Sequence, residues 1–555
     1  MNAKLLSGEL RGLRVPLPIH TFVDPPVEGY KRAWRIRPSG NPEISYWLGS
    51  TYPEAELIKC PLIDDAYDRW YLFEPDQDPK VFTIDMIAAG DPPVDLALPQ
   101  PTTAPTLVPT PVSIDDVRDV IYIYTYVTGW GEETAPSEPA TVSVDDAGQV
   151  EVSGFYVPDP GTLEPASRDW ESVRIYRSVT VEGQGGLFFV GDVPWGTDTF
   201  TDDINDATVS LNELISSGNY NPPPTGIYGA RVHPSGALVA FKGRDVYFSE
   251  PYRPHAWPET YQIAVADEIV GLEVFEQNVG VFTKGRPVML YGTTPRQIGI
   301  LKFSFPEPCV AYGSILGAPE GAYYASHQGL VLFTAVGPKN ITREAISKEE
   351  WETTYIATPD DISAARYGTQ YISTERPSTG YIIDTLEARI AFTDYQFGAS
   401  LNIVSFSEDY YSGDIYLVAD NIVYRWDPSE AEEVDYVWKS KQVILPTPAN
   451  YGAIMVHLEE RDAEYFPASQ LPVPPYPAEY VETNPNYITI DKKTQVLVEV
   501  FCNSKRILVA TAGDREQVRL PSGIKGDAWE IRVTGQCRLY SIALTETGRG
   551  QGRAG

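Results

Sequence analysis

The sequence is poor in cysteine, histidine and methionine, with four, five and four residues respectively among 555. The cysteines, Cys60, Cys309, Cys502 and Cys537, form no C-x-x-C pair and have no histidine at ligand spacing. This pattern argues against a structural zinc site, which needs clustered thiolates and imidazoles. We expect buried free thiols, as in a protein made in a reducing cytoplasm, and a meeting of Cys502 with Cys537 across one domain is the alternative.

Familiar catalytic motifs are absent as well. The sequence has no G-x-S-x-G, no P-loop, no H-E-x-x-H and no sialidase-type S-x-D-x-G-x-T-W turn. Adjacent carboxylates such as Asp202-Asp203 and Asp360-Asp361 occur in turn-like contexts, where solvated turn residues are the usual explanation. A calcium ion at Asp202-Asp203 would need a fuller ligand set than the flanking sequence supplies. We therefore expect no enzyme and assign no cofactor or metal site.

Long apolar runs are also missing. No stretch of about 18 apolar residues exists that could cross a bilayer. The start, MNAKLLSGELRGLRVPLP, lacks the apolar segment of a secretion signal. We expect a protein with no membrane span and no signal peptide.

Basic residues are few relative to acidic ones: 43 Lys and Arg face 76 Asp and Glu, which gives a formal net charge of −33. Such a chain is a poor candidate for coating nucleic acid through lysine–phosphate contacts. The acidity has two interpretations. It can simply keep a large surface soluble, or it can line an inner surface that repels a polyanion so that the polyanion slides past.

Aromatic, proline and glycine residues are abundant, with 35 Tyr, 11 Trp, 48 Pro and 44 Gly. Together with many Val, Ile and Thr, this composition favours short strands joined by turns, so we assign the chain to the all-β class. Residues 1–111 carry short aromatic strands, such as "RWYLFEPDQDPKVFTID", followed by a Pro- and Thr-rich linker. These strands have the same pattern of short apolar segments and turns as the propeller blades described next, so we expect them to join that propeller.

Residues 208–440 repeat a unit of about 40 residues, in which apolar strands alternate with turns of Gly, Asn or Asp. This period predicts β-propeller blades. One short helix is expected within "NITREAISKEEWETT", where Ser347 and Glu350 have capping-box spacing. Residues 112–207 predict six or seven alternating strands, an inserted β-sandwich whose "YTYVTGWGEETAPSEPA…VRIYRS" resembles a fibronectin type III-like module, with Trp130 and Tyr176 in its core. Residues 441–555 predict a C-terminal antiparallel β-sandwich, interrupted by an extended Pro-rich loop.

The stretch "GRDVYFSEPYRPHAWPETY", residues 243–261, places prolines, aromatics and a histidine directly after a strand. Its prolines exclude regular structure, and no nucleophile-and-base arrangement is present. We expect Tyr252, Arg253, His255 and Trp257 to serve structure or subunit contact, because rigid aromatic and arginine side chains suit protein interfaces. The alternative is a loop packed between blades.

Several stretches resemble one protein family. "CPLIDDAYDRWYLFE", "NPPPTGIYGARVHPSGALVAFKGRDVYFSEPYRPHAWPETY", "PCVAYGSILGAPEGAYYASHQGLVLFT", "VWKSKQVILPTPANYGA" and "RLPSGIKGDAWEIRVTGQCRLYSIALTET" are similar to tail nozzle proteins (tail tubular protein B-like, or tail hub proteins) of short-tailed bacteriophages. The resemblance covers the chain from about residue 55 and lies in the sequences of loops and turns, not in a catalytic motif. Residues 1–50 match more weakly.

The resemblance implies a structural virion protein, made in the host cytoplasm, that forms a hexameric ring. The ring would contact a tail adaptor ring and tail fibres or spikes, and phage DNA would pass through its lumen without tight binding. We expect an acidic lumen, with candidate carboxylates on blade loops: Asp360, Asp361, Glu408, Asp409, Glu430, Glu432 and Glu433. The alternative is a carbohydrate-binding propeller or tail spike that grips the host surface. A glycan hydrolase is a third hypothesis and would need two converging carboxylates in a pocket.

Overall fold

The computed structural model divides the chain into two compact units, residues 25–364 and residues 1–24 with 365–555, and each is described by itself. The described residues are 1–6, 9–41, 43–110, 117–145, 148–156, 158, 168–181, 184–376, 378–385, 391–397, 401–459, 464–467, 480–484, 487–490 and 495–546.

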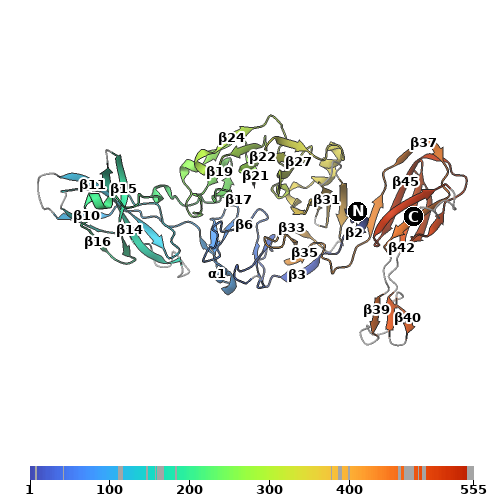
Figure 1. Ribbon diagram of the computed structural model, residues 1–555, viewed down its shortest axis with the longest axis horizontal. Helices are drawn as coiled ribbons and strands as arrows, with labels where there is room; N and C mark the ends of the chain where they lie inside the picture. The colour runs from blue at the N-terminus through green and yellow to red at the C-terminus, as the bar shows by residue number, and fades with distance from the viewer. Residues whose placement is uncertain are drawn as a thin grey trace. The chain divides into compact units, whose positions relative to one another are not determined.

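The fold is all-β, and its propeller blades are four-stranded antiparallel sheets (Figure 1). Residues 25–364 contribute four such sheets, which follow one another along the chain. The first comprises β6 (Glu56–Lys59), β7 (Trp70–Phe73), β8 (Lys80–Phe82) and β9 (Val94–Asp95). The second comprises β17 (Tyr228–Val232), β18 (Leu238–Lys242), β19 (Asp245–Phe248) and β20 (Ile263–Ala264).

The third sheet of this unit comprises β21 (Ile269–Phe275), β22 (Asn278–Thr283), β23 (Val288–Tyr291) and β24 (Gly299–Lys302). The fourth comprises β25 (Leu316–Ala318), β26 (Gly321–Ser326), β27 (Gly329–Thr334) and β28 (Gly337–Asn340). A separate hairpin pairs β4 (Arg32–Ile36) with β5 (Tyr46–Ser50). The regular 40-residue period of the sequence therefore corresponds to one sheet per repeat.

Each blade of this unit shares a hydrophobic core with the next. Phe73 and Leu238 belong to one buried cluster, Phe241 and Val281 to a second, and Phe282 with residues of β26 and β27 to a third. Middle strands such as β18 are buried on both faces, so their sequences are apolar runs without alternation. Burial on both faces is what stacks the sheets against one another.

The described residues of the inserted sandwich form seven strands in two sheets, within the six or seven that the sequence predicted. One sheet comprises β10 (Thr106–Thr110), β13 (Gln149–Ser153) and β16 (Thr199–Asp202). The other comprises β12 (Ala140–Val144), β11 (Arg118–Thr128), β14 (Trp170–Val181) and β15 (Gln184–Pro194). Strand β10 begins inside the expected linker, so the insertion starts before residue 112. Its core gathers Tyr122, Tyr124 and Tyr126 against valines of both sheets.

The second unit contains two more four-stranded sheets. One comprises β29 (Ala364–Tyr367), β30 (Gln370–Arg376), β31 (Thr379–Asp384) and β32 (Ala391–Gln396). The other comprises β33 (Ile403–Glu408), β34 (Ile415–Ala419), β35 (Ile422–Arg425) and the N-terminal strand β3 (Leu17–Thr21). Strand β3 pairs antiparallel with β35, so a strand from the start of the chain completes a sheet made about 400 residues later. Asp420 and Asn421 both have positive φ in the two-residue turn between β34 and β35, the conformation that matches hairpin twist.

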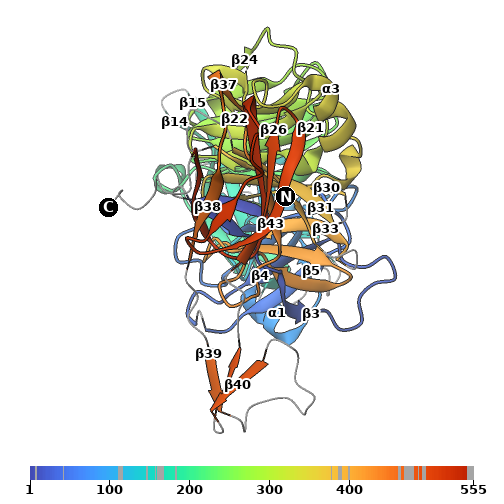
Figure 2. The same cartoon turned by 90° about the vertical axis from the view of Figure 1, so that its right-hand side faces the viewer.

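The C-terminal sandwich also recruits the start of the chain (Figure 2). One sheet comprises β1 (Ala3–Leu6), β2 (Glu9–Gly12), β46 (Leu539–Thr545), β38 (Ala453–Leu458) and β44 (Gln517–Arg519). The other comprises β36 (Tyr436–Lys439), β45 (Gly526–Gly535), β42 (Gln495–Cys502), β43 (Lys505–Gly513) and β37 (Val443–Ala449). Ala3 and Leu10 are buried in its core, so β1 and β2 belong to this sandwich. The expectation that all strands of residues 1–111 join propeller blades is therefore wrong for these two strands.

The helices are short. They are α1 (Ile84–Ala89), α2 (Asp206–Val209) and α3 (Lys348–Glu350). Helix α3 begins where it was expected: the Ser347 hydroxyl accepts a hydrogen bond from the Glu350 N–H at 3.2 Å, and a π-helical turn, Trp351–Tyr355, follows. The 3₁₀ turns are Ser217–Asn219, Glu259–Tyr261, Pro295–Gln297, Tyr312–Ser314 and Pro359–Asp361.

The Pro-rich loop expected in the C-terminal region is partly strand. A small antiparallel sheet comprises β39 (Glu464–Pro467), β40 (Tyr480–Asn484) and β41 (Tyr487–Ile490). The stretch that the sequence assigned to loop, residues 466–487, contains the last two residues of β39, all of β40 and the first residue of β41. The main proline run, residues 468–479, and residues 485–486 lie outside the described residues. The sandwich also begins at β36, a few residues before the expected boundary at 441.

Candidate functional site: ionic clusters between modules and the loop after β19

Residues 249–262 form the loop that connects β19 to β20, and Tyr252 is its exposed aromatic residue. Tyr252 has a positive φ of 59°, and its N–H donates to the Gly236 carbonyl at 2.9 Å. Its ring covers Gly236 so closely that a Cβ there would lie 2.4 Å from a ring carbon. These contacts hold Tyr252 against the turn between β17 and β18. Tyr252, with 49 % of its surface exposed, is available to a partner.

The other three predicted residues of this loop are engaged within the chain. Trp257 is buried, donates from Nε1 to the Pro254 carbonyl at 2.7 Å, and packs beside Phe73 of the preceding blade. His255 is buried as well, and the half-buried Arg253 places its guanidinium carbon 5.4 Å from the Tyr220 ring centre. A surface role as subunit contact is thus wrong for His255 and Trp257, because the inserted segment and neighbouring blade cover them. The packed-loop alternative describes them correctly.

His255 faces a buried carboxylate, Glu132, from the turn after β11 of the inserted sandwich. Arg168 donates from Nε to Glu132 Oε2 at 3.1 Å, and Arg69 donates from Nη1 to Oε1 at 3.3 Å. His255 Nδ1 lies 3.9 Å from the same Oε1. We call these residues, with Asp65 and Trp130, the Glu132 cluster.

Every arginine of the Glu132 cluster has further partners. Arg69 binds Asp65 through Nε and Nη2, at 2.9–3.1 Å. Arg168, which has no exposed surface, donates to the carbonyls of Asp95 and Leu96 at the end of the first blade. Both guanidinium groups lie over Trp130, 5.7 and 5.1 Å from its ring centre. Trp130, expected in the sandwich core, is instead buried with residues of the first two blades.

The electrostatics of the Glu132 cluster follow from burial and pairing. Burial alone would raise the pKa of Glu132, but Arg168, His255 and Arg69 hold that pKa below its ordinary value. Burial, together with the charges of Arg168 and Arg253, lowers the pKa of His255 to about 4, against the attraction of Glu132. At neutral pH the cluster therefore contains an ionised Glu132, two cationic arginines and a neutral imidazole. His255 Nε2 lies 3.2 Å from the Glu133 carbonyl, as expected for a donating N–H.

A second, partly buried cluster lies among the first strands of consecutive blades. Arg231 of β17 donates to Glu56 of β6 at 3.1 Å and to Glu273 of β21 at 2.9 Å. The Tyr312 hydroxyl donates to Glu56 at 2.9 Å. Burial would raise the pKa of Glu56, yet Arg231 and Arg32 lower it below its ordinary value. Arg231 thus ties three blades together through one guanidinium group.

The sequence did not reveal these charged residues as a site. Glu132 and Arg168 are far apart in the sequence, and no motif connects them. The one available signal was the stretch "GWGEET", where two adjacent glutamates interrupt an aromatic and β-branched strand region. A charged residue inside such a strand region is buried only when it is paired. Glu133, the second of them, accepts hydrogen bonds from Thr125, Tyr176 and Ser217 at 2.7–2.8 Å.

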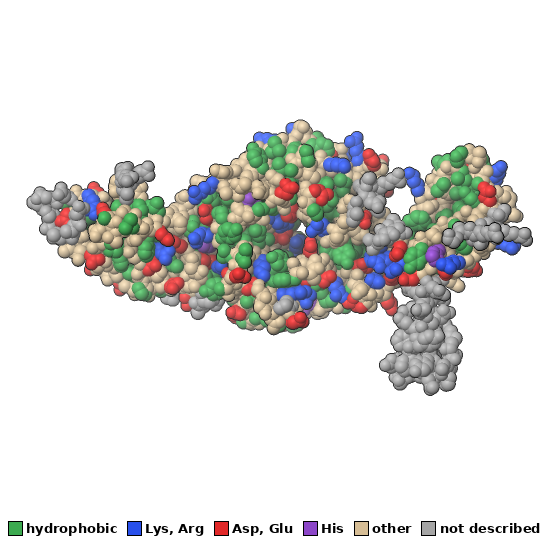
Figure 3. Space-filling view, in the orientation of Figure 1, with side chains coloured by type: hydrophobic (Ala, Val, Ile, Leu, Met, Phe, Trp, Pro, Cys, Tyr) green, Lys and Arg blue, Asp and Glu red, His purple; other side chains and the backbone are tan. Residues whose placement is uncertain are grey.

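The carboxylates expected on an acidic lumen have different environments. Asp409 is buried and accepts from the Tyr411 N–H and the Ser412 hydroxyl, so it stabilises a turn and is wrong as a lumen residue. Glu433 is half-buried and lies 3.9 Å from Arg14. The exposed members are Asp360, Asp361, Glu408, Glu430 and Glu432. On the face shown in Figure 3, acidic side chains are scattered among other types and form no continuous patch.

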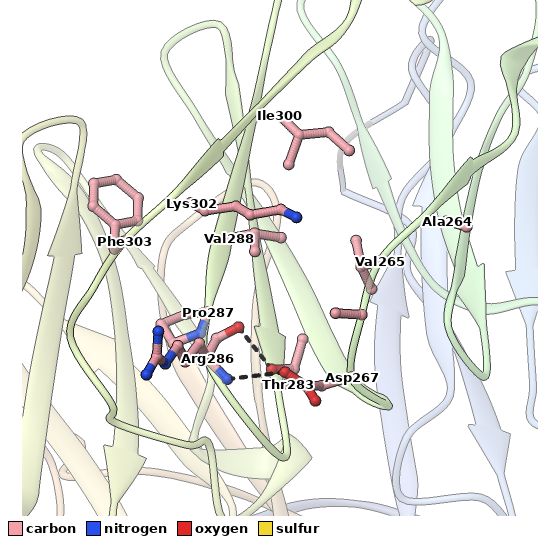
Figure 4. Close-up of a pocket in the computed structure, with 11 residues that line it drawn as sticks. Ala264, Val265, Asp267, Thr283, Arg286, Pro287, Val288, Ile300, Lys302 and Phe303 are labelled. Carbon is pink, nitrogen blue, oxygen red and sulfur yellow. Dashed lines mark hydrogen bonds between the residues drawn. The ribbon is translucent and has the colours of Figure 1, made fainter.

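A small pocket lies between the outer strands of the second and third blades (Figure 4). It has a volume of about 160 Å³, and its polar atoms are largely committed: the Arg286 N–H donates to Asp267 at 3.3 Å, and the Thr283 hydroxyl donates to the Arg286 carbonyl at 2.9 Å. Phe303 is its one aromatic lining residue, and Lys302 extends across it from β24. Asp267 is the one carboxylate among the lining residues of this pocket, whereas glycoside hydrolysis uses a pair of carboxylates.

The described residues also bear on the metal and thiol expectations. Asp202, considered for calcium, is buried and accepts from Tyr122 at 2.7 Å and Arg177 at 2.6 Å. No group of three or more His, Cys, Asp or Glu side chains in the described ranges is arranged to hold a metal ion. All four cysteines are buried free thiols, so the alternative of a Cys502–Cys537 bond is wrong. No helix among the described residues is long and apolar enough to span a membrane.

Comparison with known proteins assigns no family to the chain. No family model matches the chain. No curated protein matches it either. Similar solved structures include BBS1N in complex with ARL6DN (8% identity, 76% of this chain and 99% of that chain, TM-score 0.30) and BamB from Moraxella catarrhalis (9%, 59% and 100%, 0.25). Kluyveromyces lactis Hsv2 is another (9%, 45% and 67%, 0.25). These likenesses are too low to carry an argument about function.

Proposed function

We propose that this chain is a structural virion protein, the tail nozzle of a short-tailed phage, and that copies of it form a ring, a hexamer by the family resemblance. In this role the ring retains the genome and conducts DNA into the host. It is made in the host cytoplasm, becomes part of the virion tail, and contacts an adaptor ring and tail fibres or spikes.

One observation carries the proposal beyond the resemblance: the buried charged groups join modules to one another. Glu132 holds the insertion to residues of two blades, and Arg231 joins three blades. Breaking such a pair leaves an uncompensated buried charge, which typically costs about 3–5 kcal/mol. Modules joined in this way keep one orientation, which suits the wall of a conduit better than a hinged enzyme. The net charge of −33 adds support, because an acidic bore would give DNA no deep binding minimum.

The direct test is electron microscopy of the purified full-length chain, with ring-shaped particles as the expected result. Tyr252→Ala removes the exposed aromatic of the loop and should weaken ring formation while leaving the monomer folded. Tyr291→Ala is a matched control, because Tyr291 is also 49 % exposed and also lies against a glycine, Gly299. Equal assembly of the two variants would remove Tyr252 from the subunit contact.

A second measurement addresses the conduit. The free subunit should bind duplex DNA weakly even at low salt, where attraction by basic groups would be strongest. Trimeric particles that retain a surface glycan would instead favour the alternative, a carbohydrate-binding propeller or tail spike. Tight duplex binding by the free subunit would contradict the sliding mechanism.

A further inference from the structure

A cavity of about 630 Å³ in the second unit collects basic side chains in an otherwise acidic protein. Lys4 of β1 and Arg11 of β2 reach it from the N-terminal hairpin, Arg14 follows that hairpin, and Arg425 ends β35. The turn between β29 and β30, residues 367–370, and the segment 426–430 complete the lining. We call this the Lys4 cavity.

The acidic residues of the Lys4 cavity are already engaged. Asp427 forms a close ion pair with Lys4 and accepts from the Arg14 backbone N–H at 2.9 Å, with only 6 % of its side chain exposed. Glu430 forms a close ion pair with Arg425, and Asp414 accepts from the Ser412 hydroxyl at 2.8 Å. These carboxylates therefore have little capacity left for a further cation.

Arg11 differs from the other basic groups, because its side chain makes no ion pair or hydrogen bond with the described residues and its Nε is buried without a partner. It also lies directly opposite Lys4 in the β1–β2 ladder. Like charges at directly opposed positions of a strand pair destabilise it. An unpaired guanidinium and an opposed ammonium thus face one water-accessible space.

The titration of Lys4 reflects the same excess of positive charge. Burial, together with the charges of Arg11 and Arg14, lowers the pKa of Lys4 to about 7, against the attraction of Glu433. An anion placed in the cavity would relieve this repulsion and favour the protonated amine.

We propose that the Lys4 cavity binds an oxyanion of the phosphate type, held by Arg11 and Lys4 with Arg14 and Arg425 at its margin. Guanidinium groups present parallel N–H donors that match the oxygen pairs of such anions. The phosphate can come from a free ion or from a phosphodiester, because both present the same oxygens. This site is separate from the proposed assembly role and does not depend on it.

Sulfate is the first probe, since it has the shape of phosphate and does not titrate near neutral pH. Calorimetric titration of the full-length chain at constant ionic strength should show saturable binding. Arg11→Gln should weaken that binding at least tenfold, whereas Arg244→Gln, which changes an exposed arginine in the other unit, should leave it unchanged. Absence of saturable binding, or equal affinity of Arg11→Gln and the parent, would overturn the site.

Proton uptake provides an independent readout that avoids variants. Because a bound anion favours protonated Lys4, sulfate binding at pH 7.5 should take up protons, seen as different heats in buffers of different ionisation enthalpy. Equal heats would remove Lys4 from the site. A short thymidine oligonucleotide then distinguishes the sources: competition with sulfate assigns a phosphodiester, and sulfate or phosphate binding without oligonucleotide binding assigns a free anion.

Discussion

The Glu132 cluster and the Lys4 cavity use similar side chains in opposite ways. Around Glu132, two arginines and a neutral histidine share a buried carboxylate, and every guanidinium group has fixed acceptors. In the Lys4 cavity, an unpaired arginine stands across a strand pair from a lysine, beside space for an anion. The residue types are similar in both places. Charged side chains that are buried and paired hold modules together, whereas an unpaired one beside a cavity can bind a ligand.

This contrast has an electrostatic basis. A buried charge is tolerated when its partners satisfy it, and removing one partner leaves the other exposed to the full desolvation penalty. Arg11 faces a solvated cavity, keeps part of its hydration and has no ion-pair partner among the described residues to lose. Substitutions in the two places should therefore differ by several kcal/mol.

The largest effect is expected for Glu132→Gln. The variant preserves shape but removes the negative charge that Arg168 and Arg69 share, so unfolding free energy should fall by about 3–5 kcal/mol. Chemical denaturation followed by tryptophan fluorescence measures this, because Trp130 lies against both arginines. Glu138→Gln changes an exposed carboxylate of the same insertion and should lie within about 0.5 kcal/mol of the parent. A small loss for Glu132→Gln would mean that the cluster is not a structural joint.

A smaller effect is expected from His255 on the pH dependence of stability. The folded pKa of about 4 lies below the ordinary value of 6.5, so the unfolded chain binds the proton more tightly between these values. Stability should therefore fall as pH falls through that window, by about 2 kcal/mol between pH 7 and pH 5. His255→Gln should remove this part of the slope.

The control for His255 is His327→Gln, which alters an exposed histidine in the turn between β26 and β27. Its stability should follow the parent's pH dependence. Should His255→Gln retain the parent's slope in urea unfolding at pH 5, 6 and 7, the neutral imidazole would not be part of the closed cluster.

The two places also differ in how far the sequence could predict them. The 40-residue period predicted the blades, and alternation predicted a sandwich of six or seven strands in the insertion, because both patterns are local. The pairing of β3 with β35 and of β2 with β46 was beyond reach, since it joins residues more than 400 positions apart. Strand β40 was missed because nearby prolines outweighed its short β-branched segment.

Candidate site residues were harder to assign than strands. The prolines at 251, 254 and 258 correctly predicted that the strand ends and a loop follows, but nothing local showed that the insertion would cover His255 and leave Tyr252 outside. The opposition of Lys4 and Arg11 is local and could have been read as a hairpin register, had the first residues been recognised as a strand pair. The missing information was tertiary: which charges find partners.

The last comparison replaces an arginine by glutamine in both places, once in the Glu132 cluster and once in the Lys4 cavity. The smallest expected effect on stability belongs to Arg11→Gln. Arg69→Gln removes a sealed guanidinium bound by Asp65 and Glu132 and should destabilise the chain by about 3 kcal/mol. Arg11→Gln removes an unpaired one and should change unfolding free energy by no more than about 0.5 kcal/mol in the absence of anions.

Arg11→Gln should also raise the pKa of Lys4, because Arg11 is one of the charges that lower it. Stability of the parent rises with pH between about 7 and the ordinary lysine value, since the unfolded chain holds the proton more tightly there, and Arg11→Gln should flatten that rise. Denaturation at pH 7 and pH 9 measures both quantities. A loss for Arg11→Gln as large as that for Arg69→Gln would place Arg11 in a structural joint and end the distinction between the two clusters.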